Sequence, residues 1–389
     1  MINKLTKILK VFLSYIALLS LRSRKKVIFG AWFGNKFADN SKYLYKAMLN
    51  YSDIRPIWIT QNKDVYENMK KNRYEVYLNN SIKGIYHQLT ASAYFTCTGK
   101  ADVSYYLLSN ARHIELWHGI PLKKIMYDDK ISNDHNREND KKIIKRIMNW
   151  PGKKKRYVVS TSDKISEIYT SAFNLDKSKI IQLGQPRNDV FFSEEIEDIG
   201  FPKEYKEKKV ILYMPTHRNE GKTKIEIEKI LDLERINNIC KANGWIFLVK
   251  KHYYHKDEIT EFDKYSNIKD ITKEIYDSQM LLKYTDILIT DYSSCYIDYL
   301  LLDRPVIFYN YDYENYIMKD REMYFEYDSV TPGKKAENYL ELEKELIELI
   351  QENNDEYREL RKEVRDLFYS RDNQNKVSEK IIEHFILKK

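Results

Sequence analysis

One segment of the chain, residues 285–298, reads TDILITDYSSCYID and indicates the fold more directly than any other. Its aliphatic part, Ile287–Thr290, predicts a buried strand, and the polar residues after it predict a turn into a helix. Ser293 and Ser294 stand at the start of that helix, where hydroxyls can cap it and where free N–H groups favour an anion. Asp298, one turn further on, could accept hydrogen bonds from a ribose. Capping by itself also accounts for the two serines.

Short apolar strands alternate with helical segments through both halves of the chain, and residues 129–156 form a charged segment read as a helix with a loop. This alternation predicts an α/β fold with two Rossmann-like domains, each built on a parallel sheet. Right-handed crossovers would place the loops at the carboxyl ends of the strands, facing a cleft between the domains. Strands are predicted at residues 27–32, 55–60, 75–78, 93–98, 113–117, 157–160, 180–183, 210–214, 245–250, 287–290 and 306–309. Helices are predicted at residues 41–50, 64–72, 82–90, 162–173, 225–243, 276–284, 294–302, 338–368 and 377–386.

The length of 389 residues suits two domains of ordinary size. A charged stretch at residues 194–209, interrupted by a Gly-Phe-Pro turn, is the best candidate for the boundary between them. The sequence therefore predicts a separate N-terminal segment at 1–26, a first domain at 27–193 and a second domain at 194–389.

The net charge of +8 is concentrated at one end of the chain. Residues 1–26 carry seven basic residues and no acid, which leaves a net charge of +1 for the other 363 residues. A nearly neutral body without an aromatic RNA-binding pattern argues against a nucleic-acid-binding protein. Three cysteines without a CxxC pair, and no HExxH-like cluster, predict no metal site and suit a reducing cytoplasm. The motifs GxxxxGK[ST] and GxGxxG are absent, so P-loop and dinucleotide chemistry lack support.

The N-terminal segment has eleven uncharged residues between Lys10 and Arg22, fewer than the roughly 20 that a spanning helix needs. On a helix, the apolar residues from Leu5 to Leu19 form one stripe, and the lysines lie off it. A basic amphipathic helix of this kind favours a peripheral position on an anionic membrane surface. The alternative is a helix packed on the protein's own body.

A second motif, residues 115–124, reads ELWHGIPLKK. An apolar strand ends at His118, where an imidazole with a pKa near neutrality would suit a general base. Trp117, Gly119 and Pro121 frame the turn around it, because glycine allows close backbone approach and proline fixes the turn. We count these three as substrate-binding residues. A structural histidine that caps the turn is the alternative interpretation of His118.

Another strand ends in GQPRND, residues 184–189, and exposes Arg187, which can bind a phosphate through two hydrogen bonds. An ion pair of Arg187 with Asp189 or another local acid is the alternative. Pro215 and Thr216 follow a further strand and could line a nucleotide pocket through their backbone groups.

A third strand end carries Lys250, Lys251 and His252. Two lysines and a histidine together form a positive patch that would suit a pyrophosphate. A solvated basic edge is the alternative interpretation of this cluster.

The order of these motifs along the chain resembles the CDP-glycerol glycerophosphotransferase family, whose members build teichoic acids and related capsular polymers. The motifs are WHGIPLKK (117–124), GQPRNDVF (184–191), LYMPTHR (212–218), KKH (250–252), LITDYSSCYIDYLLLDRPVIFYNYD (288–312) and YFEYDSVTPG (324–333). Family patterns commonly have Thr where Ile120 stands and Tyr where Gln185 stands, and the KKH strand end varies. These departures leave the donor open to CDP-ribitol or another activated alditol.

The resemblance implies a GT-B-like architecture, with an acceptor-side first domain and a nucleotide-donor-binding second domain. It implies transfer of glycerol phosphate from CDP-glycerol to a hydroxyl of a polyprenyl-diphosphate-linked acceptor, at the cytoplasmic face of the bacterial membrane and without a cofactor. It gives His118 the role of base and His252 that of holding the donor phosphates, with Lys250 and Lys251 nearby. The other implied donor contacts are Arg187, Pro215, Thr216, Ser293, Ser294 and Asp298.

Two other classes of protein fit parts of the sequence. A GT-B glycosyltransferase that uses a nucleotide sugar would share the fold. A noncatalytic scaffold of the same fold would not require His118 and His252. The sequence indicates neither the number of units transferred nor the oligomeric state.

Overall fold

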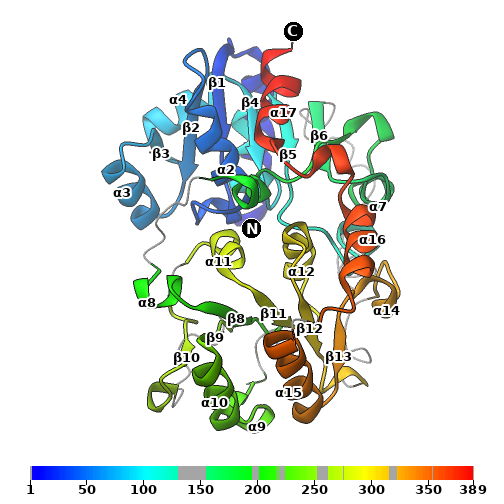
Figure 1. The fold of residues 1–389 in the computed structure, drawn as a ribbon. Coiled ribbons are helices and arrows are strands. Elements are labelled where there is room, and N and C mark those ends of the chain that lie inside the picture. Colours follow the sequence, from blue (N-terminus) through cyan, green and yellow to red (C-terminus); the bar gives the residue numbers. More distant parts are fainter. Residues whose placement is uncertain are drawn as a thin grey trace. The chain divides into compact units, whose positions relative to one another are not determined.

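The computed structural model describes residues 2–129, 155–194, 201–216, 218, 223, 225–251, 262–274, 276–314, 322–352 and 354–388, with side chains from residue 8. It divides into two compact units (Figure 1). Unit 1 comprises residues 1–119, 125–189 and 369–389, and unit 2 comprises residues 120–124 and 190–368. The charged segment predicted at 129–156 lies almost wholly outside the described residues.

Unit 1 contains a seven-stranded parallel sheet in the order β3-β2-β1-β4-β5-β6-β7. Alternate residues of β1 enter different cores, with Phe29 on one face and Ile28 on the other. Both faces of the sheet are therefore covered, as expected for a parallel sheet. The strands are β1 (Ser23–Phe29), β2 (Arg55–Thr60), β3 (Val76–Leu78), β4 (Ala91–Thr96), β5 (Arg112–Glu115), β6 (Arg156–Ser160) and β7 (Ile180–Gln182). The helices are α1 (Ile2–Ile16), α2 (Asp39–Met48), α3 (Lys63–Lys71), α4 (Ile82–Thr90), α7 (Asp163–Phe173) and α17 (Val377–Ile382).

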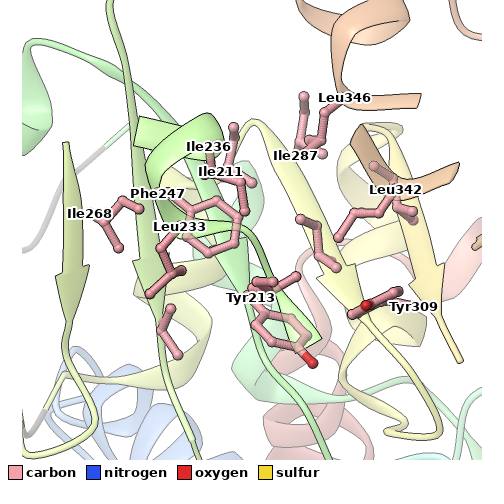
Figure 2. Packing of buried hydrophobic residues seen from close by; sticks show 14 of the residues in the cluster. Ile211, Tyr213, Leu233, Ile236, Phe247, Ile268, Ile287, Tyr309, Leu342 and Leu346 are labelled. Carbon is pink, nitrogen blue, oxygen red and sulfur yellow. The ribbon is translucent and has the colours of Figure 1, made fainter. Parts of the chain in front are cut away.

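Unit 2 contains a six-stranded parallel sheet in the order β10-β9-β8-β11-β12-β13. Figure 2 shows the core on one face, where side chains from the central strands meet Leu342 and Leu346. The strands are β8 (Lys209–Tyr213), β9 (Trp245–Val249), β10 (Ile268–Asp270), β11 (Ile287–Thr290), β12 (Val306–Tyr309) and β13 (Lys334–Ala336). The helices are α8 (Lys203–Lys206), α9 (Ile227–Ile230), α10 (Leu233–Asn243), α11 (Ser278–Tyr284), α12 (Cys295–Tyr299), α14 (Tyr327–Val330), α15 (Tyr339–Ile347) and α16 (Arg358–Phe368). The predicted α/β class with two parallel sheets is confirmed.

The end of the chain differs from the predicted division at 27–193 and 194–389. The first boundary falls within a few residues of the expected position, but residues 369–389 belong to unit 1. Helix α17 lies beside α2 over the first sheet (Figure 1). Its apolar residues Val377, Ile381 and Ile382 are buried in the unit 1 core. The periodicity of the sequence shows this apolar stripe but not the surface that it packs against. The unit that buries the stripe determines to which unit the helix belongs.

A long predicted helix is broken in the structure, and two short strands were not predicted. The helix expected at 338–368 becomes α15, a π-helical segment at 348–352, and α16. Asp355 lies in the break and forms an ion pair with the buried Arg361, in keeping with the preference of Asp for turns. The short strands β10 and β13 were not predicted, because three residues carry too little periodicity.

The N-terminal segment forms helix α1, which is partly packed on unit 1. Ser14 and Ala17 are buried, and the Arg22 guanidinium donates to the carbonyl oxygens of Gln88 and Leu107. Much of its apolar stripe remains exposed all the same. The alternative of a helix packed on the protein's own body therefore holds in part, and the position on a membrane surface stays a prediction. Among the described helices, none has the length and apolar character needed to span a bilayer.

Candidate active site

The strand order reverses between β1 and β4 in unit 1, and between β8 and β11 in unit 2. In open α/β sheets, ligands bind at such reversal points, outside the carboxyl ends of the strands. In unit 1 the adjoining loops begin at Gly30 and Cys97, and in unit 2 they begin at Met214 and Asp291. The motifs predicted from the sequence occupy these loops or the neighbouring strand ends.

His118 lies three residues beyond β5, with its ring near the indoles of Trp32 and Trp117. Its Nδ1 is 3.0 Å from the carbonyl oxygen of Cys97, which can only accept, so Nδ1 carries the proton. Nε2 then has its lone pair available and contacts no described hydrogen-bonding group. Burial lowers the pKa of His118, although Asp39 and the Cys97 carbonyl oppose this. A neutral imidazole with an available Nε2 is the form that a general base requires.

Asn40 holds the backbone around His118 in place. Its Nδ2 donates to the carbonyl oxygen of Trp117 at 2.8 Å, and its Oδ1 accepts from the N–H of Arg187 at 3.1 Å. Trp117 has φ of 57°, a left-handed conformation that costs a non-glycine residue about 1–3 kcal/mol. Asn40 is fully buried, and its hydrogen bonds maintain the strained turn that sets the direction of the His118 side chain.

Arg187 is brought to the same turn as His118. Its NH1 donates to the carbonyl oxygen of His118 at 2.7 Å and forms a 2.9 Å ion pair with Asp39. The acid that pairs with Arg187 is therefore Asp39, while Asp189 accepts from the N–H groups of Val377 and Ser378. Arg187 is a positioning residue for the His118 turn in this structure, and a donor contact by it stays a prediction.

A buried carboxylate joins the two loops of unit 1. Asp102 accepts from the N–H groups of Phe33, Cys97 and Thr98 at 2.7–2.9 Å. It therefore connects the loop after β1 with the loop after β4. Burial raises the pKa of Asp102, and the hydrogen bonds it accepts oppose that rise.

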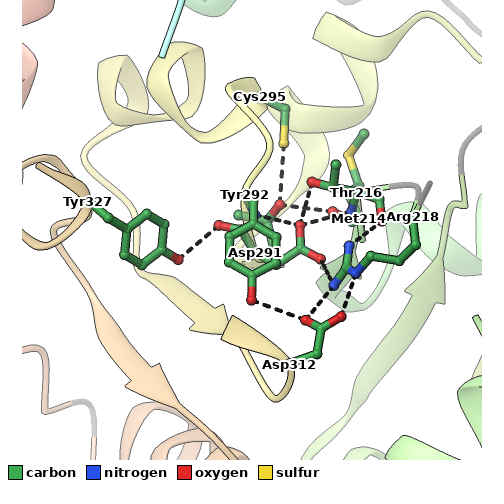
Figure 3. Close-up of polar contacts among 9 residues, drawn as sticks. Met214, Thr216, Arg218, Asp291, Tyr292, Cys295, Asp312 and Tyr327 are labelled. Carbon is green, nitrogen blue, oxygen red and sulfur yellow. Dashed lines mark hydrogen bonds and ion pairs between the residues drawn. The ribbon is translucent and has the colours of Figure 1, made fainter. Parts of the chain in front are cut away.

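Asp291 has the corresponding position in unit 2, directly after β11 (Figure 3). Its Oδ1 accepts from both the N–H and the hydroxyl of Thr216, at 2.8 and 2.5 Å, and from the N–H of Tyr292. The side chain is completely buried. The structure thus brings Thr216 together with the DYSS turn (residues 291–294) through a carboxylate that the sequence analysis did not use.

Arg218 completes this network. Its guanidinium forms ion pairs with Asp291 at 2.9 Å and Asp312 at 2.6 Å, and lies over the ring of Tyr292 (Figure 3). Burial alone would lower the pKa of Arg218, but the two carboxylates outweigh it and raise the pKa. Three loops, after β8, β11 and β12, are therefore joined by charged side chains.

The serines of the DYSS turn differ from the expected cap. Ser294 stands at the N-cap of α12 without a side-chain hydrogen bond, and the Ser293 hydroxyl accepts from the N–H of Cys295 at 3.3 Å. Asp298 is buried and accepts from the Nε2 of Gln279 at 3.2 Å. Ser294 and Ser293 are only partly buried, so they are the members of this turn best placed for a ligand.

The lysine cluster is more buried than a solvated basic edge would be. Lys251 is 4% exposed, and the Lys250 ammonium donates to the carbonyl oxygen of Glu274 at 2.9 Å. Burial lowers the pKa of Lys250. The predicted neighbour, His252, lies outside the described residues. Pro215 is buried beside Thr216.

The WHGIPLKK motif belongs to both units. Residues 117–119 lie in unit 1, whereas residues 120–124, with Pro121, cluster with unit 2. There the Lys124 N–H donates to the carbonyl oxygen of Glu322, and the two side chains form an ion pair. The positive charge of Lys124 is therefore balanced locally.

Glu115, the last residue of β5, lies completely buried before the His118 turn. Thr96 donates to its Oε2 at 3.0 Å and is 2.7 Å from Nε2 of His113, which stacks on Tyr94. Burial raises the pKa of Glu115 to about 7, and it also lowers the pKa of His113. Burial therefore favours the uncharged form of both side chains.

Several residues that build the site had no role in the sequence prediction. The described part of the chain has no group of three His, Cys, Asp or Glu side chains arranged to hold a metal ion. What it has is a set of buried or partly buried anchors that position loops. These anchors are Asp39, Asn40, Asp102, Arg218, Asp291 and Asp312.

Two units, each built on a parallel sheet whose strand order reverses once, define an α/β protein with two Rossmann-like units. Comparison with known proteins gives the family. The chain matches CDP-Glycerol:Poly(glycerophosphate) glycerophosphotransferase over residues 12–387 and belongs to that family.

The curated relatives make teichoic acids. A Staphylococcus aureus teichoic acid glycerol-phosphate transferase is 28% identical over 377 residues, covering 92% of this chain and 93% of the relative. A Staphylococcus epidermidis teichoic acid poly(glycerol phosphate) polymerase is 30% identical over 362 residues, covering 89% of this chain and 48% of the relative. The chain thus spans about half the length of that polymerase. Among solved structures, the wall teichoic acid polymerase TagF is similar, with a TM-score of 0.72, 27% identity, and coverage of 98% of this chain and 96% of that chain.

Removing the charge of Asp291 should destabilise unit 2. We expect Asp291→Asn to lower the free energy of unfolding by about 3–5 kcal/mol, because Arg218 would lose a buried partner. Urea denaturation followed by circular dichroism measures the change. Asp328→Asn, at an exposed carboxylate paired with Lys335, is the matched control and should cost about 0–1 kcal/mol. Equal effects for the two variants would contradict the role assigned to Asp291.

Glu115→Gln should flatten the dependence of stability on pH. The folded pKa of about 7 lies above the ordinary glutamate pKa of 4.5, so the stability due to protonated Glu115 is present below about pH 4.5 and is lost as pH rises to 7. Relative to wild type, the variant should gain on the order of 3 kcal/mol between pH 5 and pH 8. His113 is present in both proteins, so its opposite effect on the pH dependence of stability cancels in the difference between them.

Thermal and urea unfolding at several pH values provide this comparison. Glu204→Gln, an exposed change of the same kind, should follow wild type at every pH. A constant difference between Glu115→Gln and wild type across the range would show that Glu115 is already ionised in the folded protein.

Proposed function

We propose that this protein transfers glycerol phosphate from CDP-glycerol to a hydroxyl of a lipid-linked glycan or growing surface polymer and releases CMP. The observation that carries the proposal is the geometry of His118, a neutral imidazole with an available Nε2 at a strand end. Its place in a chain that matches the family over residues 12–387 supports the same activity. One of the similar TagF structures was obtained after a soak with CDPG.

The acceptor side of the reaction is assigned to unit 1. Nε2 of His118 removes the proton from the acceptor hydroxyl, and the hydroxyl oxygen attacks the β-phosphorus of the donor. The bond from this phosphorus to the CMP oxygen breaks, and CMP leaves. Arg187 and Asn40 hold the backbone on either side of the imidazole, so the base is positioned before the acceptor arrives.

The donor side is assigned to unit 2. Ser293 and Ser294 at the DYSS turn bind phosphate oxygens, and Thr216 and Pro215 border the cytidine. Asp291 holds Thr216 close to this turn. His252, with Lys250 and Lys251 beside it, neutralises the phosphates, and Asp298 completes the pocket. Phosphoryl transfer depends mainly on such positioning and neutralisation, and the proposal requires no cofactor.

A ribitol-phosphate donor is the second candidate. A Staphylococcus aureus ribitol-phosphate polymerase is 34% identical over 194 residues, which cover 48% of this chain. The two alditols carry the same CDP group, so the contacts assigned to the nucleotide and phosphates apply to both donors.

We also propose that the protein acts as a peripheral protein at the cytoplasmic face of the membrane. Phe12, Leu19 and Leu21 are 61%, 85% and 90% exposed on or just after α1. Their burial in a lipid surface, next to a segment with seven basic residues, would bring the enzyme to a lipid-linked acceptor.

A donor panel tests the activity. The protein is incubated with a synthetic lipid-linked acceptor and CDP-glycerol, CDP-ribitol or UDP-sugars, and the released nucleotide and product masses are measured. We expect CMP release with CDP-glycerol and products heavier by whole glycerol phosphate units. One added unit would indicate a priming enzyme and a ladder a polymerase. UDP release with transfer of a sugar would overturn the proposal in favour of a glycosyltransferase.

If His118 is the base, its removal should lower turnover without changing the affinity for the donor. His118→Ala should lower kcat by about 100-fold or more, while the donor affinity measured by calorimetry stays within about twofold, because the base contacts the acceptor. His384→Ala, an exposed histidine of unit 1, is the matched control and should keep full activity.

His252→Ala provides the contrast on the donor side and should lose both donor affinity and turnover. Full activity of His118→Ala would contradict the role of the base, whereas unchanged donor affinity of His252→Ala would contradict only the donor contact.

A further inference from the structure

A pocket of ≈ 490 Å³ opens on unit 1 at the end of the sheet opposite to His118. Its lining comes from the start of β4, β5 and β6 and from residues just before β1, β5 and β6. Strand β5 begins here at Arg112 and ends at Glu115, three residues before His118. The pocket is therefore separate from the strand-end loops described above. The lining residues are Arg22, Ser92, Asn110, Arg112, Lys155 and Tyr157.

Among the described residues, the lining carries three cations and no acid. Within the described part of the chain, no ion pair involves Arg22, Arg112 or Lys155. The Lys155 ammonium donates to the backbone and side-chain oxygens of Asn110 at 3.0 and 2.7 Å. Three positive charges around one pocket, with no carboxylate among the lining residues, create a site for an anion.

Arg22 shows the lack of a negative counter-charge most clearly. Its guanidinium donates to the carbonyl oxygens of Ala17, Gln88, Ala91 and Leu107 at 2.8–3.1 Å. These partners are neutral, and the buried Nε has no hydrogen-bond partner. Burial lowers the pKa of Arg22 to about 10. A guanidinium that is desolvated without a counter-charge gains from an anion nearby.

The pocket also adjoins the exposed apolar end of α1. Asn110, in the lining, donates to the carbonyl oxygen of Leu18, and Arg22 follows Leu21 directly. Leu19 and Leu21 are 85% and 90% exposed. Apolar side chains next to a basic pocket match a molecule with both a phosphate and acyl chains, whereas a free phosphate would use only the pocket.

We propose that this basic pocket beside α1 binds the phosphate group of an anionic membrane phospholipid. Arg112 and Lys155 contact the phosphate oxygens, while the leucines after α1 enter the acyl region. This inference rests on the proposed membrane location, and it is independent of which donor the enzyme uses.

Vesicle flotation of the full chain tests the proposal. Vesicles of phosphatidylcholine alone are compared with vesicles that also contain phosphatidylglycerol. Arg112→Gln/Lys155→Gln should weaken binding to the phosphatidylglycerol vesicles by roughly 30-fold, given about fivefold for each basic residue at the surface. Binding to phosphatidylcholine through α1 should not change.

The matched control is Lys63→Gln/Lys71→Gln, which removes the same charge from exposed positions on α3 of the same unit. It should weaken binding by about twofold or less, because distant exposed charges are screened. Equal losses for the two double variants would overturn the proposal, since bulk charge would then explain them. No loss for the pocket variant would overturn it as well.

Inorganic phosphate provides the soluble comparison. Calorimetric binding of phosphate to wild type and not to the pocket variant, with equal vesicle affinities for both proteins, would assign the pocket to free phosphate and overturn the lipid assignment. Circular dichroism checks that each variant is folded; Arg112→Gln alone is the substitute if the double variant unfolds. Flotation needs neither donor nor acceptor, so its result is separate from the test of the transfer reaction.

Discussion

The candidate donor site depends on one buried carboxylate. Asp291 accepts from the backbone and hydroxyl of Thr216 and from the N–H of Tyr292, and it pairs with Arg218. A charge with no solvent contact is stable only if each of its lone pairs is satisfied. The loops that supply those donors are therefore fixed in one arrangement, since moving any of them would leave the charge unsatisfied.

Unit 1 also has a buried carboxylate that holds two loops together. Asp102 joins the loops after β1 and β4 through three backbone N–H groups, as Asp291 joins the loops after β8 and β11. Both carboxylates lie at the point where the strand order reverses, which is where parallel sheets leave loop N–H groups without partners. Preorganised loops lower the reorganisation that a reaction needs, and so these anchors serve the site without touching a substrate.

The sequence predicts the parts of the fold that periodicity encodes. Strands such as β8 and β11 are continuous apolar runs, and the turn after β11 has a distinct composition, so the location of Thr216 and the two serines could be predicted. Asp102 could not, because nothing in its neighbourhood distinguishes it from a surface acid before the loops are placed. The partner of Arg187 could not be predicted for a similar reason. The nearest acid in the sequence, Asp189, accepts hydrogen bonds from helix α17, and the acid that forms the ion pair with Arg187 is Asp39. Long-range pairing of charges is decided by topology, which local pattern does not contain.

The division of the chain between the units has a consequence for biosynthesis. The chain passes from one unit to the other four times, and the final segment, 369–389, returns to unit 1. Val377, Ile381 and Phe385 fill the core beneath β1 and β4. Because a ribosome delivers the chain from its N-terminus, every residue of unit 2 emerges before the core of unit 1 is complete. Unit 1, which begins at the N-terminus, therefore cannot complete its core before the whole of unit 2 has been synthesised.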